Sequence, residues 1–93
     1  MNKLEVLDFW AEWCGPCRAM GPAIESLMEQ YNTEGSNVEI KKVNVDTEPA
    51  LTQKYGIRSI PTIVFVKDGE EVNRLSGSQS KTKLSEVINK SLA

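Results

Sequence analysis

Two cysteines, Cys14 and Cys17, are the only thiols of the chain, and they flank the dipeptide Gly15-Pro16. Two thiols at this spacing can exchange with a disulfide in another molecule, form a static structural disulfide, or supply half of a four-thiolate zinc site. The chain has no histidine, which excludes imidazole metal ligands and every mechanism in which a histidine activates a serine or cysteine. Because zinc prefers four ligands, a zinc site here would need a second copy of the chain.

The cysteines lie where an expected strand leads into an expected helix. Residues 4–11 are apolar and β-prone over about the length of one strand. From Cys17 onward, apolar residues recur at steps of three and four, which predicts a helix with one buried face: Met20, Ala23, Ile24, Leu27, Met28 and Tyr31. We interpret this stripe as core. Gly21-Pro22 falls inside it and should kink the helix, because proline removes a backbone hydrogen bond.

The second half of the chain predicts two further strands and a hairpin. Residues 38–45 and 62–66 have strand patterns, and the turn at 67–70 leads into a fourth strand at 71–75. Between the second and third strands a short helix is expected. Thr47 is its expected cap, Pro49 fits its first turn, and Gly56 would end it.

The last expected helix starts after Ser80, a favourable capping residue, and carries one apolar face: Leu84, Val87, Ile88 and Leu92. The resulting order is strand, helix, strand, short helix, then strand, strand, helix. It predicts an α/β fold with a mixed four-stranded sheet and helices on both faces. The first two strands should be parallel, with a right-handed crossover, and the last two antiparallel. The length of 93 residues suits a single domain spanning residues 1–93.

Composition narrows the classes of function. The net charge of −2 gives no electrostatic argument for binding nucleic acid or an anionic membrane. No window approaches 18 apolar residues, so no membrane span is expected. Glu5 and Asp8 interrupt the apolar N-terminal stretch, so no signal peptide is expected. The expected location is the reducing cytoplasm, where such a cysteine pair is more often redox-active or metal-binding than a static disulfide.

The junction of strand and helix favours redox chemistry. If Cys14 is the N-cap, its sulfur can accept a hydrogen bond from the amide of Cys17, since Pro16 has no N–H. The helix N-terminus adds positive potential, and both effects favour a thiolate on Cys14. We expect Cys14 to be exposed and Cys17, one turn into the helix, to be less so. Dithiol exchange needs this asymmetry between an attacking and a resolving thiol.

The segment DFWAEWCGPC followed by Arg18, and the segment GIRSIPT before the hairpin, resemble the thioredoxin family. The resemblance covers nearly the whole chain in order. Its Trp-Cys-Gly-Pro-Cys motif is specific, because glutaredoxins, disulfide isomerases and periplasmic oxidases usually carry other residues between the cysteines. The resemblance begins on the family's second strand, so the usual first strand and first helix are expected to be missing. Ser76-Gly77-Ser78 also departs from the family, which usually has small apolar residues around this glycine.

The resemblance implies roles for the catalytic residues. Cys14 would be the attacking nucleophile and Cys17 the resolving thiol, and together they would form the redox disulfide. Asp8 matches a buried aspartate that is thought to move a proton for Cys17, and Lys42 matches the lysine near that carboxylate. Pro61 matches a cis-proline that faces the disulfide.

The resemblance also implies a docking surface, in which Ile60 would pair with the substrate backbone. The expected members of this surface are Trp13, Gly15, Pro16, Ile60, Pro61 and Gly77. The family implies no bound cofactor or metal, only the dithiol itself. Its partners would be disulfide-containing proteins and a flavoprotein thioredoxin reductase or an equivalent electron donor. A monomer is expected, without nucleic acid or membrane.

Simpler interpretations stay open for these residues. Asp8 could be an exposed polar residue, although its apolar strand, expected to be central, favours burial. Lys42 could be an ordinary solvated lysine, Trp13 could belong to the core, and Pro61 could be trans, as most prolines are. For the whole chain, the alternative to a protein-disulfide reductase is a non-catalytic thioredoxin-like binding subunit of a larger complex. A dimeric zinc protein is a further alternative.

Overall fold

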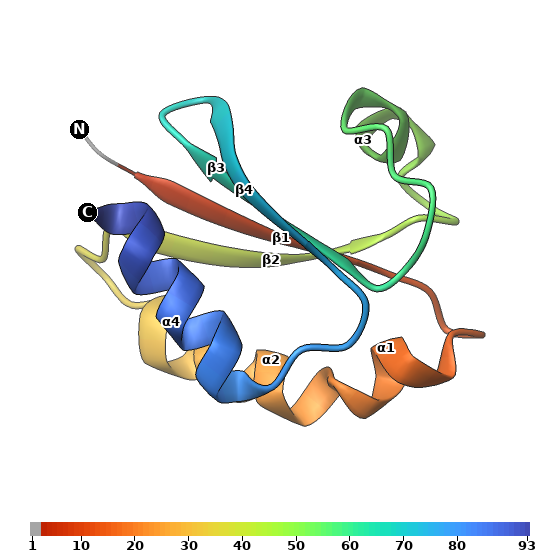
Figure 1. Cartoon of the computed structure of the whole chain (residues 1–93), viewed down its shortest axis with the longest axis horizontal. Helices are drawn as coiled ribbons and strands as arrows, with labels where there is room; N and C mark the ends of the chain where they lie inside the picture. Colours follow the sequence, from red (N-terminus) through yellow and green to blue (C-terminus); the bar gives the residue numbers. More distant parts are fainter. Residues whose placement is uncertain (1–2) are drawn as a thin grey trace.

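The computed structural model describes residues 3–93, and within this range a mixed sheet is formed by β1 (Leu4–Trp10), β2 (Val38–Asn44), β3 (Thr62–Lys67) and β4 (Glu70–Ser76). The strand order is β2-β1-β3-β4. Strand β1 runs parallel to β2 and antiparallel to β3, and β3 and β4 form an antiparallel hairpin. The predicted mixed four-stranded sheet is confirmed, with β1 in a central position (Figure 1).

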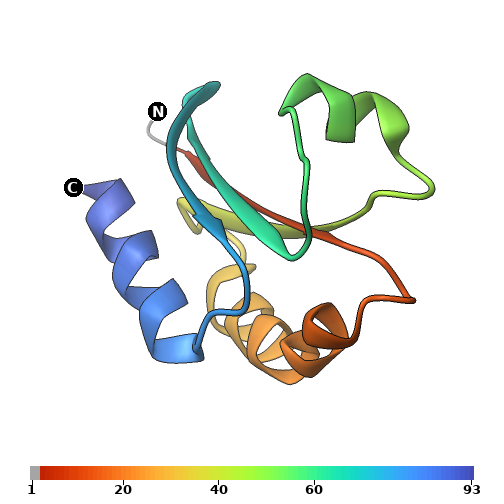
Figure 2. The ribbon, with the colours of Figure 1, turned by 45° about the vertical axis from the view of Figure 1, so that its right-hand side comes forward.

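Helices cover both faces of the sheet (Figures 1 and 2). Helices α1 (Gly15–Ala19), α2 (Gly21–Tyr31) and α4 (Lys81–Leu92) lie on one face, and α3 (Pro49–Lys54) lies on the other. The side chains of Ile24, Phe65 and Ile88 belong to the apolar core between the sheet and the face covered by α1, α2 and α4. Phe9 and Val64 lie in a smaller core on the α3 side of the sheet, and Leu51 and Tyr55 pack against it.

The long helix predicted after Cys17 is broken, as the Gly21-Pro22 pair predicts. Helix α1 ends at Ala19, Met20 lies at the junction, and α2 begins at Gly21 with a proline in its first turn. The break has a simple cause: Pro22 has no N–H to donate to the carbonyl of the preceding turn. It makes α1 a short separate helix whose N-terminus carries the cysteine pair.

The predictions at helix and hairpin ends are partly confirmed. The Ser80 hydroxyl caps α4 by accepting a hydrogen bond from the Lys83 N–H at 3.1 Å. The hairpin turns at Asp68-Gly69, where both residues have positive φ. The predicted cap of α3 is wrong: Glu48 is the N-cap, and the Thr47 hydroxyl instead donates to the carbonyl of Asn44 at 3.4 Å. The turn that leaves β2 uses this hydroxyl before the helix begins.

Two side chains from the α2–β2 connection form hydrogen bonds with backbone groups on the outer side of β2. The Asn32 carboxamide accepts from the Ile40 N–H at 2.7 Å and donates to the Ile40 carbonyl at 2.8 Å. The Ser36 hydroxyl makes the corresponding pair of bonds with Val38, at 3.0 and 3.2 Å. An edge strand presents such groups to any other extended chain. Asn32 and Ser36 therefore take the place of a neighbouring strand along the first half of β2.

We expect Asn32→Ala to lower the free energy of unfolding by about 1–2 kcal/mol, because two hydrogen bonds to the Ile40 backbone are lost together. Urea unfolding of both proteins measures the difference. Gln30→Ala, at an exposed position of α2, is the matched control and should change stability by less than about 0.5 kcal/mol. Equal stability of the two variants would show that the Asn32 bonds do not stabilise the sheet edge.

Candidate active site

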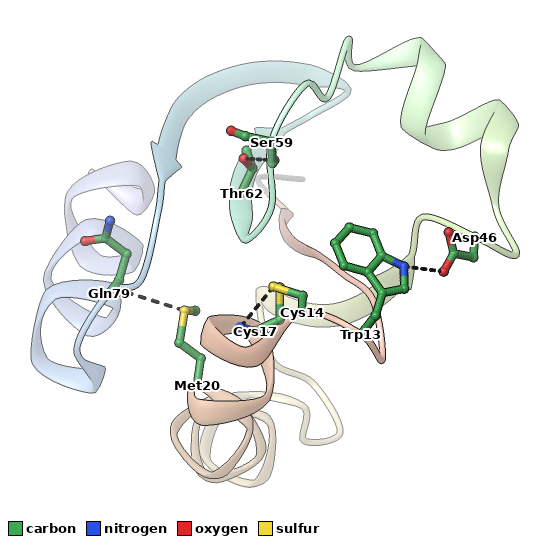
Figure 3. Close-up of a disulfide and its surroundings, with 8 residues drawn as sticks. All are labelled: Trp13, Cys14, Cys17, Met20, Asp46, Ser59, Thr62 and Gln79. Atoms are coloured by element: carbon green, nitrogen blue, oxygen red, sulfur yellow. Dashed lines mark hydrogen bonds between the residues drawn. A yellow bond between two sulfur atoms is a disulfide. The ribbon is translucent and has the colours of Figure 1, made fainter.

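The cysteine pair lies at the N-terminus of α1 (Figure 3). Cys14 is the N-cap with extended backbone, and its Sγ accepts a hydrogen bond from the Cys17 N–H at 3.2 Å. The two cysteines form a disulfide, with their Cα atoms 5.3 Å apart. The predicted cap geometry is therefore confirmed: the sulfur of Cys14 lies at the positive end of the helix and is bonded to a helical amide.

One prediction about the dithiol is wrong. The sequence predicts an exposed Cys14 and a less exposed Cys17, but the exposed fractions are 6% and 5%. Both pack with Ala11, and partly buried Trp10, Val45 and Ile60 lie against this cluster. The N-cap position brings the sulfur of Cys14 back over the helix end rather than out into solvent. The asymmetry between the two cysteines is thus one of hydrogen bonding and helix position, not of exposed area.

Trp13 is the exposed aromatic residue beside the pair, with an exposed fraction of 70%. Its indole Nε1 donates to a carboxylate oxygen of Asp46 at 2.9 Å, which fixes the ring next to the disulfide (Figure 3). The structure thereby decides against Trp13 as a core residue. A hollow of about 290 Å³ lies beside the ring, with Val45, Ile57 and Ile60 in its wall. An exposed, oriented ring next to an apolar hollow is a suitable contact surface for another protein.

Asp8 is buried in the middle of the sheet, with an exposed fraction of 3%. It shares a face of β1 with Leu4 and Val6, which pack beneath the helices, and it lies on the strand that leads into Ala11. Its partner in the β1–β2 register is Lys42, whose Nζ lies 4.4 Å from the centroid of the Trp10 ring. Burial raises the pKa of the Asp8 carboxyl from 3.8 to about 6, and the Lys42 ammonium opposes this shift.

The segment before β3 forms another side of the site. The Ile60–Pro61 peptide bond is cis, as the resemblance implies. The Thr62 hydroxyl donates to the Ser59 carbonyl at 2.7 Å and holds this turn closed (Figure 3). The Gly77 N–H donates to the Pro61 carbonyl at 2.8 Å. Ile60 packs against the cysteine cluster, so the 60–61 turn, the Gly77 loop and the helix N-terminus surround one patch.

The structure brings most of the predicted site residues together. Gly15 and Pro16 are exposed in the first turn of α1, between the two cysteines. Asp46, which orients Trp13, is not among the predicted residues. Its only sequence signal is its position directly after the expected second strand. Gln79, whose backbone N–H donates to the Met20 sulfur at 3.4 Å, is also not among them. Neither contact leaves a pattern in the sequence, because both join segments far apart in the chain.

Comparison with known proteins agrees with this geometry. The family model described as Thioredoxin matches residues 1–90. The chain belongs to the thioredoxin family. It is 48% identical to thioredoxin of Chlamydia caviae over 86 residues, covering 92% of this chain and 80% of that protein. It is 43% identical to thioredoxin of Porphyra purpurea over 90 residues, covering 96% of this chain and 81% of that protein.

Solved structures give the same family. The X-ray structure of Fasciola hepatica thioredoxin is 44% identical, with a TM-score of 0.83, covering 95% of this chain and 80% of that one. A mutant thioredoxin from Halobacterium salinarum is 35% identical at the same TM-score, with 99% and 77% covered. With the family and the Cys14–Cys17 pair in place, the protein is a thiol-disulfide oxidoreductase that reduces protein disulfides by dithiol exchange. The alternative of a non-catalytic binding subunit is not favoured.

Two other kinds of site are absent from the described part of the chain. Across residues 3–93, no group of three or more histidine, cysteine, aspartate or glutamate side chains is placed to hold a metal ion. Over the same range, no helix has the length and apolar character needed to cross a bilayer.

The shifted carboxyl gives stability a pH dependence of definite sign. Between pH 3.8 and about 6, folded Asp8 holds a proton that the unfolded chain has released. The folded state is therefore favoured most below this range and loses stability as pH rises through it. A shift of about two pKa units corresponds to about 3 kcal/mol, the largest effect to be expected from this group.

We therefore expect Asp8→Asn to be more stable than the wild type at about pH 7, by up to about 3 kcal/mol, with the advantage vanishing near pH 4. Urea unfolding of the oxidised proteins across this range measures it. Glu29→Gln, at an exposed position of α2, is the control and should show no comparable pH-dependent difference. A wild type that is the more stable protein at neutral pH would contradict the account of Asp8.

Proposed function

We propose that Cys14 is the attacking thiol and Cys17 the resolving thiol of a protein-disulfide reductase. The observation that carries the assignment is the hydrogen bond from the Cys17 N–H to the Cys14 sulfur at the N-cap of α1. In the reduced protein this bond and the helix N-terminus stabilise negative charge on Cys14. Cys17 is one turn inside the helix, so its sulfur is not at the helix end as that of Cys14 is.

The exchange proceeds in two balanced steps. The Cys14 thiolate attacks one sulfur of the partner's disulfide; a mixed disulfide forms, and the other partner sulfur leaves as a thiolate that takes up a proton. Cys17 then loses its proton and attacks the Cys14 sulfur, which breaks the mixed disulfide and releases the second partner thiolate. Two electrons have passed to the partner, and the protein ends with the Cys14–Cys17 disulfide that the structure shows.

We propose that Asp8 accepts the proton that Cys17 loses when it attacks the mixed disulfide. The carboxyl is buried on the strand that leads into the cysteine cluster, and its pKa is raised to about 6. A carboxyl with a pKa close to the working pH can both accept and return a proton. Lys42 faces Asp8 across the β1–β2 pair and keeps that pKa from rising further. We propose Lys42 as the residue that tunes this carboxyl.

The proposed docking surface surrounds the pair and comprises Trp13, Gly15, Pro16 and Gly77, which are exposed, together with half-buried Ile60 and buried Pro61. Three observations support it. Trp13 is exposed and held in place by Asp46. Ile60 lies both in the hollow beside Trp13 and against the cysteine cluster. Gly77 is bonded to Pro61. An extended segment of a partner that pairs with Ile60 would bring its disulfide over Cys14.

The remaining assignments concern the cellular setting. We propose disulfide-containing proteins as substrates and a flavoprotein thioredoxin reductase, or an equivalent donor, as the source of electrons. The dithiol needs no other bound cofactor in this scheme. Because the pair must be reduced again after each turnover, we place the protein in the cytoplasm, where thiols are kept reduced. We treat residues 1–93 as one thioredoxin-like domain that acts as a monomer, without nucleic acid or membrane.

Cys17→Ser should stop the exchange at the first step, because the variant can form the mixed disulfide but cannot resolve it. Incubation of the reduced variant with insulin should give a covalent adduct, seen on non-reducing gels and by mass spectrometry, that dithiothreitol releases. The wild type should instead reduce insulin catalytically in the presence of dithiothreitol.

The matched control is Cys14→Ser, which should form little adduct and show no catalysis. A stable adduct through Cys17 in that variant, equal to the one through Cys14, would reverse the assigned roles. Failure of the wild type to accelerate insulin reduction over dithiothreitol alone would contradict the proposed function.

A further inference from the structure

The loop after β4 is tied to the helix break by an unusual contact. The backbone N–H of Gln79 donates to the thioether sulfur of Met20 at 3.4 Å (Figure 3). The side chain of Gln79 turns back over its own loop, and its Nε2 donates to the carbonyls of Ser76 at 3.2 Å and Gly77 at 3.3 Å. Gln79 thus closes the loop on itself and fastens it to Met20.

Met20 connects this loop to α1, the helix that carries the cysteine pair. It is 5% exposed and lies between α1 and α2. Its backbone N–H donates to the carbonyl of Pro16, one of the two residues between the cysteines, at 3.2 Å. A methionine in a core usually supplies adaptable packing, and its sulfur is a weak acceptor. Here the sulfur also has a defined partner, on the segment that carries Gly77.

The same loop is fastened on its other side. The Gly77 N–H donates to the Pro61 carbonyl at 2.8 Å, and Gly77 has a φ of +87°, a conformation that glycine adopts most readily. A continuous series of contacts therefore runs from α1 through Met20, Gln79 and Gly77 to Pro61. Ser76, Gly77 and Ser78 are exposed along this path, so the contacts hold an otherwise solvated loop at a fixed position beside the disulfide.

We propose that Met20 and Gln79 are positioning residues for protein substrates: they hold the loop that carries Gly77 in the position that a substrate docking beside Pro61 requires. This inference rests on the proposed docking role of Gly77 and Pro61. A preorganised loop lowers the cost of ordering the complex. Loss of the Met20–Gln79 contact should therefore weaken the binding of a protein substrate, because such a substrate covers the loop. The thiol chemistry depends on the N-cap bond of Cys14, which the contact does not touch.

Met20→Leu tests the proposal, because leucine keeps the volume and removes the sulfur acceptor. With insulin as the substrate, we expect KM to rise about three- to tenfold, the range that corresponds to one lost hydrogen bond, with kcat within about twofold. KM for a small disulfide such as 5,5′-dithiobis(2-nitrobenzoate) should rise much less. Met28→Leu is the matched control: Met28 packs against the same core from α2, and the substitution should change neither constant.

Hydrogen exchange of the Gln79 amide provides a readout that general destabilisation does not explain. In Met20→Leu this amide should exchange several-fold faster, while the amides of β1 keep their protection; in Met28→Leu it should exchange as in the wild type. Gln79→Ala, which removes the side-chain bonds on the exposed side, should also raise KM for insulin, and it tests the proposal even if Met20→Leu folds poorly.

Three results would overturn the inference. One is an unchanged KM for insulin in both Met20→Leu and Gln79→Ala. Another is an unchanged Gln79 amide in Met20→Leu. The third is an equal loss of rate with insulin and with the small disulfide, which would place the effect on the chemistry. A wild type that does not reduce insulin at all would instead contradict the proposed function, so the two failures are distinguishable.

Discussion

The hydrogen bond from the Cys17 N–H to the Cys14 sulfur is the interaction on which the site depends. It exists because a strand ends at Trp10, a helix starts at Gly15, and Pro16 cannot donate in its first turn. The break at Met20 keeps this helix short and separate from α2. Since the two cysteines are almost equally buried, the difference in reactivity that we propose for them has to come from this bond and from the helix end.

The rest of the fold supplies what a short helix cannot. The central strand β1 places a carboxyl, Asp8, in the apolar layer, where burial raises its pKa to about 6. That position costs stability at neutral pH, and the neighbouring Lys42 limits the cost. Around the disulfide, bonds between distant segments fix the exposed parts: Asp46 holds Trp13, and Pro61 holds Gly77. The proposed docking surface is thereby built from short loops that hydrogen bonds hold in place.

Local patterns in the sequence predicted the elements well because they depend on near neighbours. The three- and four-residue spacing indicated the helix after Cys17, and Gly21-Pro22 indicated the break that separates α1 from α2. Ser80 indicated the start of α4. The cap geometry of Cys14 followed from Pro16. Thr47 failed as a cap because its hydroxyl serves the turn out of β2. The burial of Cys14, the Asp46–Trp13 bond and the Gln79–Met20 contact depend on how distant segments approach, which residue spacing does not encode.

Alkylation of the reduced protein tests the central claim most directly. With limiting iodoacetamide at mildly acidic to neutral pH, peptide mass spectrometry gives the rate for each cysteine separately. If the N-cap bond and the helix end favour the thiolate of Cys14, this residue should be modified much faster than Cys17, although their exposed fractions in the disulfide form are 6% and 5%. Equal rates, or faster modification of Cys17, would contradict the account.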